Sequence, residues 1–198
     1  MKMQVTPGMT ATVGAVHVTA APVLIETLSL SQAFSFLIMR HATADPRELM
    51  IEDADRCLIE KGRQQAIRAG QFLRRHAFWP EHIFSSPYPR ALQTAQLVAR
   101  QHELAPIIHD VETLAPEGGF TATELLHKAS AHSLSLWVGH EPDLSQLLAE
   151  LCGIREWPMP LKKASLTMLS FVPASEHTPA RVLLDWHIPA RLMPKVPE

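Results

Sequence analysis

Short apolar runs and longer amphipathic stretches alternate along this chain from about residue 34 onward. The apolar runs have the length of buried strands and lie at residues 35–39, 82–85, 106–109, 135–138, 166–171 and 182–188. The amphipathic stretches, with apolar residues at helical spacing, lie at residues 59–75, 89–102, 121–131 and 143–152. This alternation predicts an α/β fold with three α/β/α layers around a mostly parallel central sheet.

Three of the apolar runs lead directly into polar residues that can carry chemistry. Arg40 and His41 follow the first run, Arg90 begins the helix after the second, and His140 follows the fourth. In open α/β sheets, ligands bind just beyond the carboxyl ends of the strands. Because these ends lie at one edge of a parallel sheet, the sequence predicts that Arg40, His41, Arg90 and His140 meet there.

These residue types suit the transfer of a phosphoryl group. A histidine with an unprotonated ring nitrogen can attack phosphorus, and the planar fork of an arginine matches the oxygens of a phosphate. Ser86 adds a hydroxyl, which either contacts a phosphate oxygen or caps the turn before the helix. The N-terminus of the helix that begins near Arg90 supplies further backbone donors.

The segments that carry these residues resemble the motifs of the histidine phosphatase superfamily, which is also called phosphoglycerate mutase-like. The matching segments are residues 37–44 with Arg-His-Ala, 59–66 in the first helix, 85–94 around the second arginine, and 138–148 around the second histidine. Within the superfamily the chain is most similar to the SixA-type phosphohistidine phosphatases. The resemblance runs from about residue 34 to 192 and takes in residues 162–165.

This resemblance implies a phosphoglycerate mutase-like fold and a phosphatase that needs no metal or other cofactor. His41 is the expected nucleophile, which forms a covalent phosphohistidine, and Arg40, Arg90 and His140 are expected to bind the phosphoryl group. The implied substrate is phosphohistidine on a histidine-phosphotransfer domain or similar protein carrier, and the product is inorganic phosphate. Two alternatives stay open: a small-molecule phosphomonoesterase of the same superfamily, and a non-catalytic domain that binds phosphopeptides.

The residue that protonates the leaving group is the least determined part of the expected site. Related enzymes take a carboxylic acid from the loop after the third strand, where this chain has Glu112 and Glu117. Glu141, beside His140, is a third candidate. We choose Glu112 for this role, although each of the three carboxylates is also accounted for as a solvated surface group.

Composition narrows the class of protein further. The 198 residues are 46% hydrophobic and 19% charged, which is globular, and a net charge of −2 argues against a broad nucleic-acid surface. The 11 histidines show no metal-ligand spacing, and no apolar run approaches the roughly 20 residues that span a bilayer. The two cysteines, Cys57 and Cys152, are read as reduced thiols, so we expect a cytoplasmic protein.

The first 33 residues have no counterpart in the resemblance. They are rich in Thr, Val, Ala and Pro, and contain no apolar core of signal-peptide quality. Residues 12–18 and 23–25 are predicted to form a β-hairpin or an added edge strand. We therefore divide the chain into an N-terminal extension, residues 1–33, and a histidine phosphatase domain, residues 34–198. The oligomeric state is left open.

Overall fold

The computed structural model describes residues 30–46, 52–158 and 160–194, and these residues form a six-stranded sheet with four α-helices. The strands are β1 (Phe34–Arg40), β2 (His82–Ser85), β3 (Ile107–Asp110), β4 (Leu134–Gly139), β5 (Leu166–Val172) and β6 (Arg181–Ile188). The α-helices are α1 (Glu60–Arg75), α2 (Pro89–Ala99), α3 (Ala122–Ala129) and α4 (Asp143–Leu151). Three 3₁₀ turns are η1 (Asp53–Asp55), η2 (Glu112–Leu114) and η3 (Ala190–Leu192). The predicted strands at 12–18 and 23–25 lie outside the described residues.

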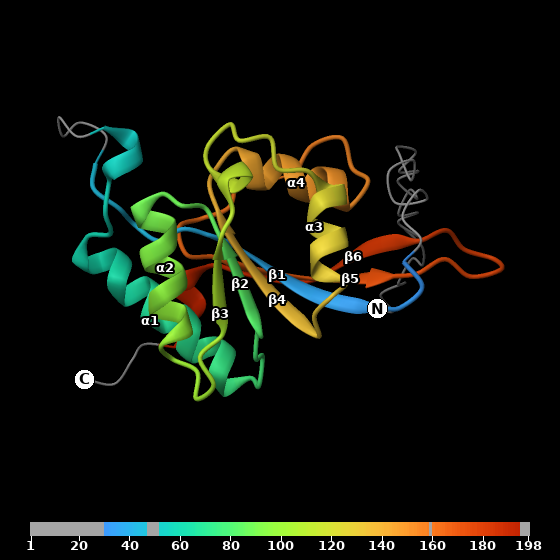
Figure 1. The fold of residues 1–198 in the computed structure, drawn as a ribbon, viewed down its shortest axis with the longest axis horizontal. Helices are drawn as coiled ribbons and strands as arrows, with labels where there is room; N and C mark the ends of the chain where they lie inside the picture. The colour runs from blue at the N-terminus through green and yellow to red at the C-terminus, as the bar shows by residue number, and fades with distance from the viewer. Residues whose placement is uncertain (1–29, 47–51, 159, 195–198) are drawn as a thin grey trace, which may run out of the picture.

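The strand order is β3-β2-β4-β1-β5-β6. The first four of these neighbours pair in parallel, whereas β5 runs antiparallel to both β1 and β6. The expected mostly parallel sheet is therefore confirmed, with the antiparallel strands confined to one side. β1, β2 and β4 lie side by side, so their carboxyl ends open at one edge of the sheet (Figure 1).

Alternating side chains of β1 face two separate cores, one on each side of the sheet. Phe36 and Ile38 pack with residues of α3 and α4, whereas Leu37 and Met39 pack with residues of α1 and α2. All four side chains are fully buried, as expected for a strand covered on both faces. Figure 1 shows α1 and α2 on one side of the sheet and α3 and α4 on the other. The predicted α/β/α layers are thus confirmed.

Several helix boundaries differ from the sequence prediction. The helix expected to reach residue 102 ends at Ala99, because Gln101 and His102 continue as turns whose N–H groups bond the carbonyls of Val98 and Ala99. The helix expected from residue 121 begins at Ala122, since the Thr121 hydroxyl accepts the Glu124 N–H and caps the first turn from outside. Such ends depend on individual hydrogen bonds that hydrophobic periodicity does not encode.

Helix α1 is packed tightly against the loop that follows His41. A Cβ atom on Gly62 would lie 1.9 Å from the carbonyl oxygen of Thr43, so only glycine permits this approach. One turn further, the Gln65 side chain accepts hydrogen bonds from the Thr43 N–H at 3.0 Å and its hydroxyl at 2.7 Å. These contacts fix the chain immediately beyond His41.

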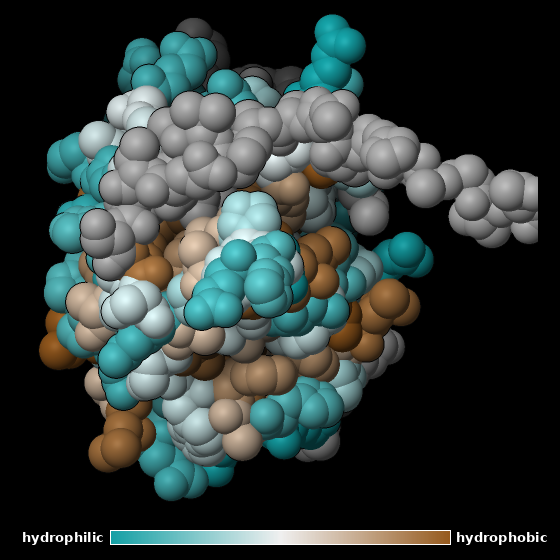
Figure 2. Space-filling model, turned by 90° about the vertical axis from the view of Figure 1, so that its right-hand side faces the viewer, coloured by the Kyte–Doolittle hydropathy of each residue, from teal (hydrophilic) through white to brown (hydrophobic). Residues whose placement is uncertain are grey.

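The side of the molecule from which the β5–β6 hairpin projects shows no simple division by hydropathy. Figure 2 shows hydrophilic and hydrophobic residues interspersed over the described part of this face. Leu183 and Leu184 of β6 are 42% and 45% exposed, which is ordinary for scattered apolar residues on a protein surface. The polar chemistry predicted from the sequence is concentrated instead at the carboxyl ends of the parallel strands.

Candidate active site

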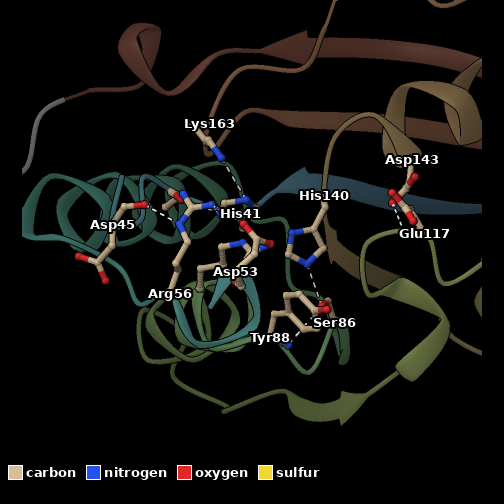
Figure 3. Close-up of polar contacts among 12 residues, drawn as sticks. His41, Asp45, Asp53, Arg56, Ser86, Tyr88, Glu117, His140, Asp143 and Lys163 are labelled. Atoms are coloured by element: carbon tan, nitrogen blue, oxygen red, sulfur yellow. Dashed lines mark hydrogen bonds and ion pairs between the residues drawn. The ribbon is translucent and has the colours of Figure 1, made fainter. Parts of the chain in front are cut away.

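The carboxyl ends of β1, β2 and β4 bring the predicted polar residues together. Arg40 is the last residue of β1, and His41 follows it with its N–H bonded to the Gly139 carbonyl at 3.0 Å. His140 follows β4, and its ring centroid lies 4.9 Å from that of His41. Arg90 lies in the first turn of α2, beyond β2. The expected convergence is present in the structure, and Figure 3 shows the two histidines facing each other.

His41 presents one defined ring nitrogen to the site. Its Nδ1 lies 2.8 Å from the Ala42 carbonyl oxygen, and a carbonyl only accepts, so Nδ1 carries the ring proton. Nε2 then has the free lone pair, and it accepts a hydrogen bond from Lys163 Nζ at 3.0 Å. Burial, followed by the positive charge of Lys163, lowers the pKa of His41 far below its ordinary value. The imidazole is therefore neutral and can act as a nucleophile.

His140 is the same tautomer but is turned the other way. Its Nε2 lies 2.8 Å from Ser86 Oγ, which also accepts the Tyr88 N–H at 3.3 Å. Among the described residues, the Ser86 hydroxyl hydrogen has no acceptor other than His140 Nε2, so we assign the ring proton of His140 to Nδ1. Burial and then the charge of Arg90 lower the pKa of His140 to about 3. In Figure 3 the nitrogen that does not contact Ser86 is directed toward His41.

Arg90 is held by an aspartate that sequence reasoning did not assign to the site. Its guanidinium donates through Nη2 to Asp53 Oδ2 at 2.7 Å and through Nη1 to the Asp53 carbonyl. The other carboxylate oxygen of Asp53 accepts from Arg56 Nη1 at 2.6 Å. Burial alone would raise the pKa of Asp53, but the hydrogen bond from Arg56 and the charge of Arg90 lower it. Asp53 is thus an anion that orients two arginines.

Arg90 Nε–H and His140 Nδ1–H are buried at this site and have no acceptor among the described residues. Arg40, half-buried beside them, donates through Nη1 to the Leu161 carbonyl at 2.6 Å. Thr94 ties α2 to the nucleophile's loop, since its hydroxyl accepts the Ala42 N–H and donates to the Arg90 carbonyl. Fixed donors and cations around a neutral imidazole are what a phosphoryl group requires.

The three candidate carboxylates are placed differently. Glu112 and Glu117 are exposed, and the Glu112 side chain makes no hydrogen bond or ion pair with a described residue. Glu117 bonds through its backbone N–H to Asp143 at 3.1 Å, away from His41 in Figure 3. Glu141 is half-buried and accepts from the Ser145 hydroxyl at 2.7 Å, and burial raises its pKa. Proton donation by Glu112 and direct contact of Ser86 with phosphate both stay predictions.

Lys163 was also missed at the level of sequence. It belongs to residues 162–165, which the resemblance included without giving Lys163 a role.

Among the described residues, no group of three or more His, Cys, Asp or Glu side chains is arranged to hold a metal ion. None of the described helices is long and apolar enough to cross a membrane.

Comparison with known proteins agrees with this geometry. Residues 36–113 match the model of histidine phosphatase superfamily, branch 1. An uncharacterized protein of Picosynechococcus sp. is 34% identical over 131 residues, which cover 64% of this chain and 79% of that protein. The chain belongs to the histidine phosphatase superfamily.

Solved structures share the fold at lower sequence identity. The protein histidine phosphatase SixA, complexed with tungstate, superposes with a TM-score of 0.67 at 22% identity, covering 80% of this chain and 98% of SixA. A mycobacterial glucosyl-3-phosphoglycerate phosphatase gives a TM-score of 0.61 at 21% identity, covering 78% and 98%. The expected phosphoglycerate mutase-like, SixA-like fold is confirmed. The family match and the assembled site together support phosphatase activity.

Proposed function

We propose that this protein removes the phosphoryl group from phosphohistidine on a protein carrier, through a covalent phosphohistidine on His41. The observation that carries this proposal is the hydrogen bond from His41 Nδ1 to the Ala42 carbonyl, 2.8 Å long. It leaves the Nε2 lone pair directed into a site that contains Arg90, His140 and Lys163. A neutral nucleophile among fixed cations fits attack on an anionic phosphoryl group.

The reaction proceeds in two displacements. His41 Nε2 attacks phosphorus, the bond from phosphorus to the substrate imidazole breaks, and that imidazole leaves with its electron pair and takes a proton from solvent. Water then attacks the phosphorus on His41 and gives up a proton to solvent, the bond to Nε2 breaks with its electron pair returning to His41, and inorganic phosphate is released. Arg40, Arg90 and His140 bind the phosphoryl oxygens in both steps, and their contacts strengthen as the group becomes planar.

The choice of a phosphohistidine substrate rests on the leaving group. An imidazole takes up a proton readily, so its departure needs little help from a buried acid, whereas an alkoxide needs protonation. Glu112 and Glu117 are both exposed, which suits the first case better than the second. The similarity to SixA, a protein histidine phosphatase, supports a protein carrier. We place this carrier in the cytoplasm, in a signalling pathway. The free thiols Cys57 and Cys152 are compatible with the cytoplasm.

A small-molecule phosphomonoesterase is the second candidate, because the mycobacterial glucosyl-3-phosphoglycerate phosphatase shares the fold almost as closely. A turnover panel separates the two. We expect the highest kcat/KM with a phosphorylated histidine-phosphotransfer domain, and low values with 3-phosphoglycerate and p-nitrophenyl phosphate. A preference for 3-phosphoglycerate or another phosphate ester would replace the proposal by the second candidate. Absence of turnover on every substrate would favour a non-catalytic phosphopeptide-binding domain.

The panel also tests Glu112 as the acid. If Glu112 is the acid, Glu112→Gln will slow hydrolysis of an alkyl phosphate strongly and that of p-nitrophenyl phosphate little, because nitrophenolate leaves without protonation. Equal effects on both esters would remove Glu112 from the mechanism, and the same comparison then applies to Glu117 and Glu141.

A further inference from the structure

Lys163 is built into the site by backbone hydrogen bonds rather than merely reaching it from the surface. The N–H of Ala164, the next residue, bonds the Arg40 carbonyl at 3.0 Å, and the Ser165 N–H closes a turn onto the Lys162 carbonyl at 3.0 Å. Ala164 is fully buried and has a φ of 57°, a conformation that residues other than glycine rarely adopt. The backbone that carries Lys163 is therefore fixed to the strand that carries the nucleophile.

The ammonium of Lys163 lies at the atom that reacts. Lys163 Nζ is 3.0 Å from His41 Nε2, and this nitrogen is the acceptor because Nδ1 already donates to the Ala42 carbonyl. Figure 3 shows the lysine entering from the side opposite Ser86. A phosphorus atom that bonds to Nε2 must take the direction of this lone pair. The ammonium then has to exchange Nε2 for another acceptor, and the phosphoryl oxygens arrive at that position.

We propose that Lys163 is a catalytic residue whose ammonium passes from His41 Nε2 to an oxygen of the phosphoryl group as that group bonds to Nε2. This inference rests on the proposed function and adds a third cation, beside Arg40 and Arg90, to the groups that contact the phosphoryl oxygens. Before the phosphoryl group bonds, the ammonium donates a hydrogen bond to Nε2. In the phosphoenzyme the same ammonium neutralises charge on the transferred group until water releases phosphate.

Two features distinguish this role from a structural one. The charge of Lys163 is the second largest cause, after burial, of the low pKa of His41. It also lowers the pKa of His140, so the ammonium interacts electrostatically with both rings. Lys162, the preceding residue, has the same charge and lies in the same turn, but its side chain is exposed. A purely structural role of the turn would be served by its backbone, which substitutions at residues 162 and 163 leave in place.

The test compares Lys163→Met and Lys163→Arg with the matched control Lys162→Met, after circular dichroism and thermal melting have shown that each is folded. We expect Lys163→Met to lose about a hundredfold in kcat/KM, the range seen when one fixed donor to a reacting oxyanion is removed. We expect Lys162→Met to stay within twofold of the wild type. Lys163→Arg, which keeps the charge, should recover at least tenfold of the loss.

Binding of orthovanadate, measured by isothermal titration calorimetry, is the readout that does not depend on turnover. Lys163→Met should weaken vanadate binding at least tenfold and Lys162→Met should not. Vanadate affinity within threefold of the wild type in folded Lys163→Met would overturn the proposal, whatever its effect on rate. If the wild type shows no turnover on any phosphate, the proposed function fails, while the vanadate comparison still decides whether Lys163 contacts the oxyanion.

Discussion

The ends of strands β1 and β4 each present a buried, neutral histidine in the same tautomer, yet the two rings face the site with opposite nitrogens. At the end of β1, the Nδ1–H of His41 is bonded to the Ala42 carbonyl, so the bare Nε2 faces the site. At the end of β4, the bare Nε2 of His140 accepts from Ser86, so the Nδ1–H faces the site. The partner behind each ring thus decides whether the histidine attacks or donates.

The largest expected effect is the loss of His41. We expect His41→Ala to reduce turnover to the background rate, because no other described residue presents an unprotonated ring nitrogen among these cations. Vanadate should still bind, since Arg90 and His140 remain. The measurement is kcat/KM with phosphorylated protein, and the control is His177→Ala, an exposed histidine. Appreciable turnover by His41→Ala would break the comparison, because His41 would then not be the nucleophile.

Arg90→Ala is expected to have the next largest effect, about a hundredfold or more on kcat/KM, or roughly 3 kcal/mol in the barrier. Its guanidinium is almost fully buried, with 3% of the side chain exposed, so its charge is poorly screened. Arg100→Ala, an exposed arginine at the end of the same helix, is the matched control. If Arg90→Ala had the same kcat/KM as Arg100→Ala, Arg90 would serve only to pair with Asp53.

Ser86→Ala sharpens the comparison directly, because it removes the partner behind His140 and leaves the one behind His41. Without the hydroxyl, the His140 proton is no longer directed to Nδ1, and we expect kcat/KM to fall about tenfold. Imidazole ¹⁵N chemical shifts should report a change of tautomer at His140 and none at His41. Ser130→Ala, an exposed serine at the end of α3, is the control. An unchanged tautomer in Ser86→Ala would contradict the role assigned to this hydrogen bond.

The smallest expected effect is on stability as a function of pH. The pKa of His140 is about 3 in the folded protein against 6.5 in the unfolded chain. As the pH falls, His140 therefore takes up its proton in the unfolded chain before it does so in the folded protein. The stability that the neutral His140 contributes is fully present above pH 6.5 and is lost as pH falls toward 3. The free energy of unfolding, from urea titrations, should fall less steeply below pH 6.5 in His140→Gln than in the wild type. If the free energy of unfolding fell equally steeply with pH in both proteins, protonation of His140 would not destabilise the folded state.

The sequence predicted those parts of the site that depend on strand ends. Apolar runs place Arg40, His41 and His140 just beyond parallel strands, and parallel strands bring their ends together. Asp53 and Lys163 were not predicted, because their positions depend on single long-range contacts. One is the ion pair from η1 to Arg90, and the other is the bond from the Ala164 N–H to the Arg40 carbonyl. Periodicity gives no signal for contacts of this kind.

Ser86 illustrates the same limit at shorter range. Its place before the second arginine was readable from the sequence, but its hydroxyl contacts the ring of His140, 54 residues away. The antiparallel pairing of β5 with β1 was likewise hidden, since apolar runs of similar length do not reveal strand direction. The chain therefore specifies which residues reach the site more plainly than it specifies how they are oriented there.

Trapping the phosphoenzyme tests the central claim most directly. Wild-type protein mixed with a phosphorylated histidine-phosphotransfer domain is quenched within milliseconds in alkali, where phosphohistidine persists, and is then digested and analysed by mass spectrometry and ³¹P NMR. We predict one phosphate per chain, on Nε2 of His41, and none in His41→Ala. Phosphate on Nδ1 of His41, on His140, or on a serine or cysteine would contradict the assignment of His41 Nε2 as the attacking atom and His140 as a donor.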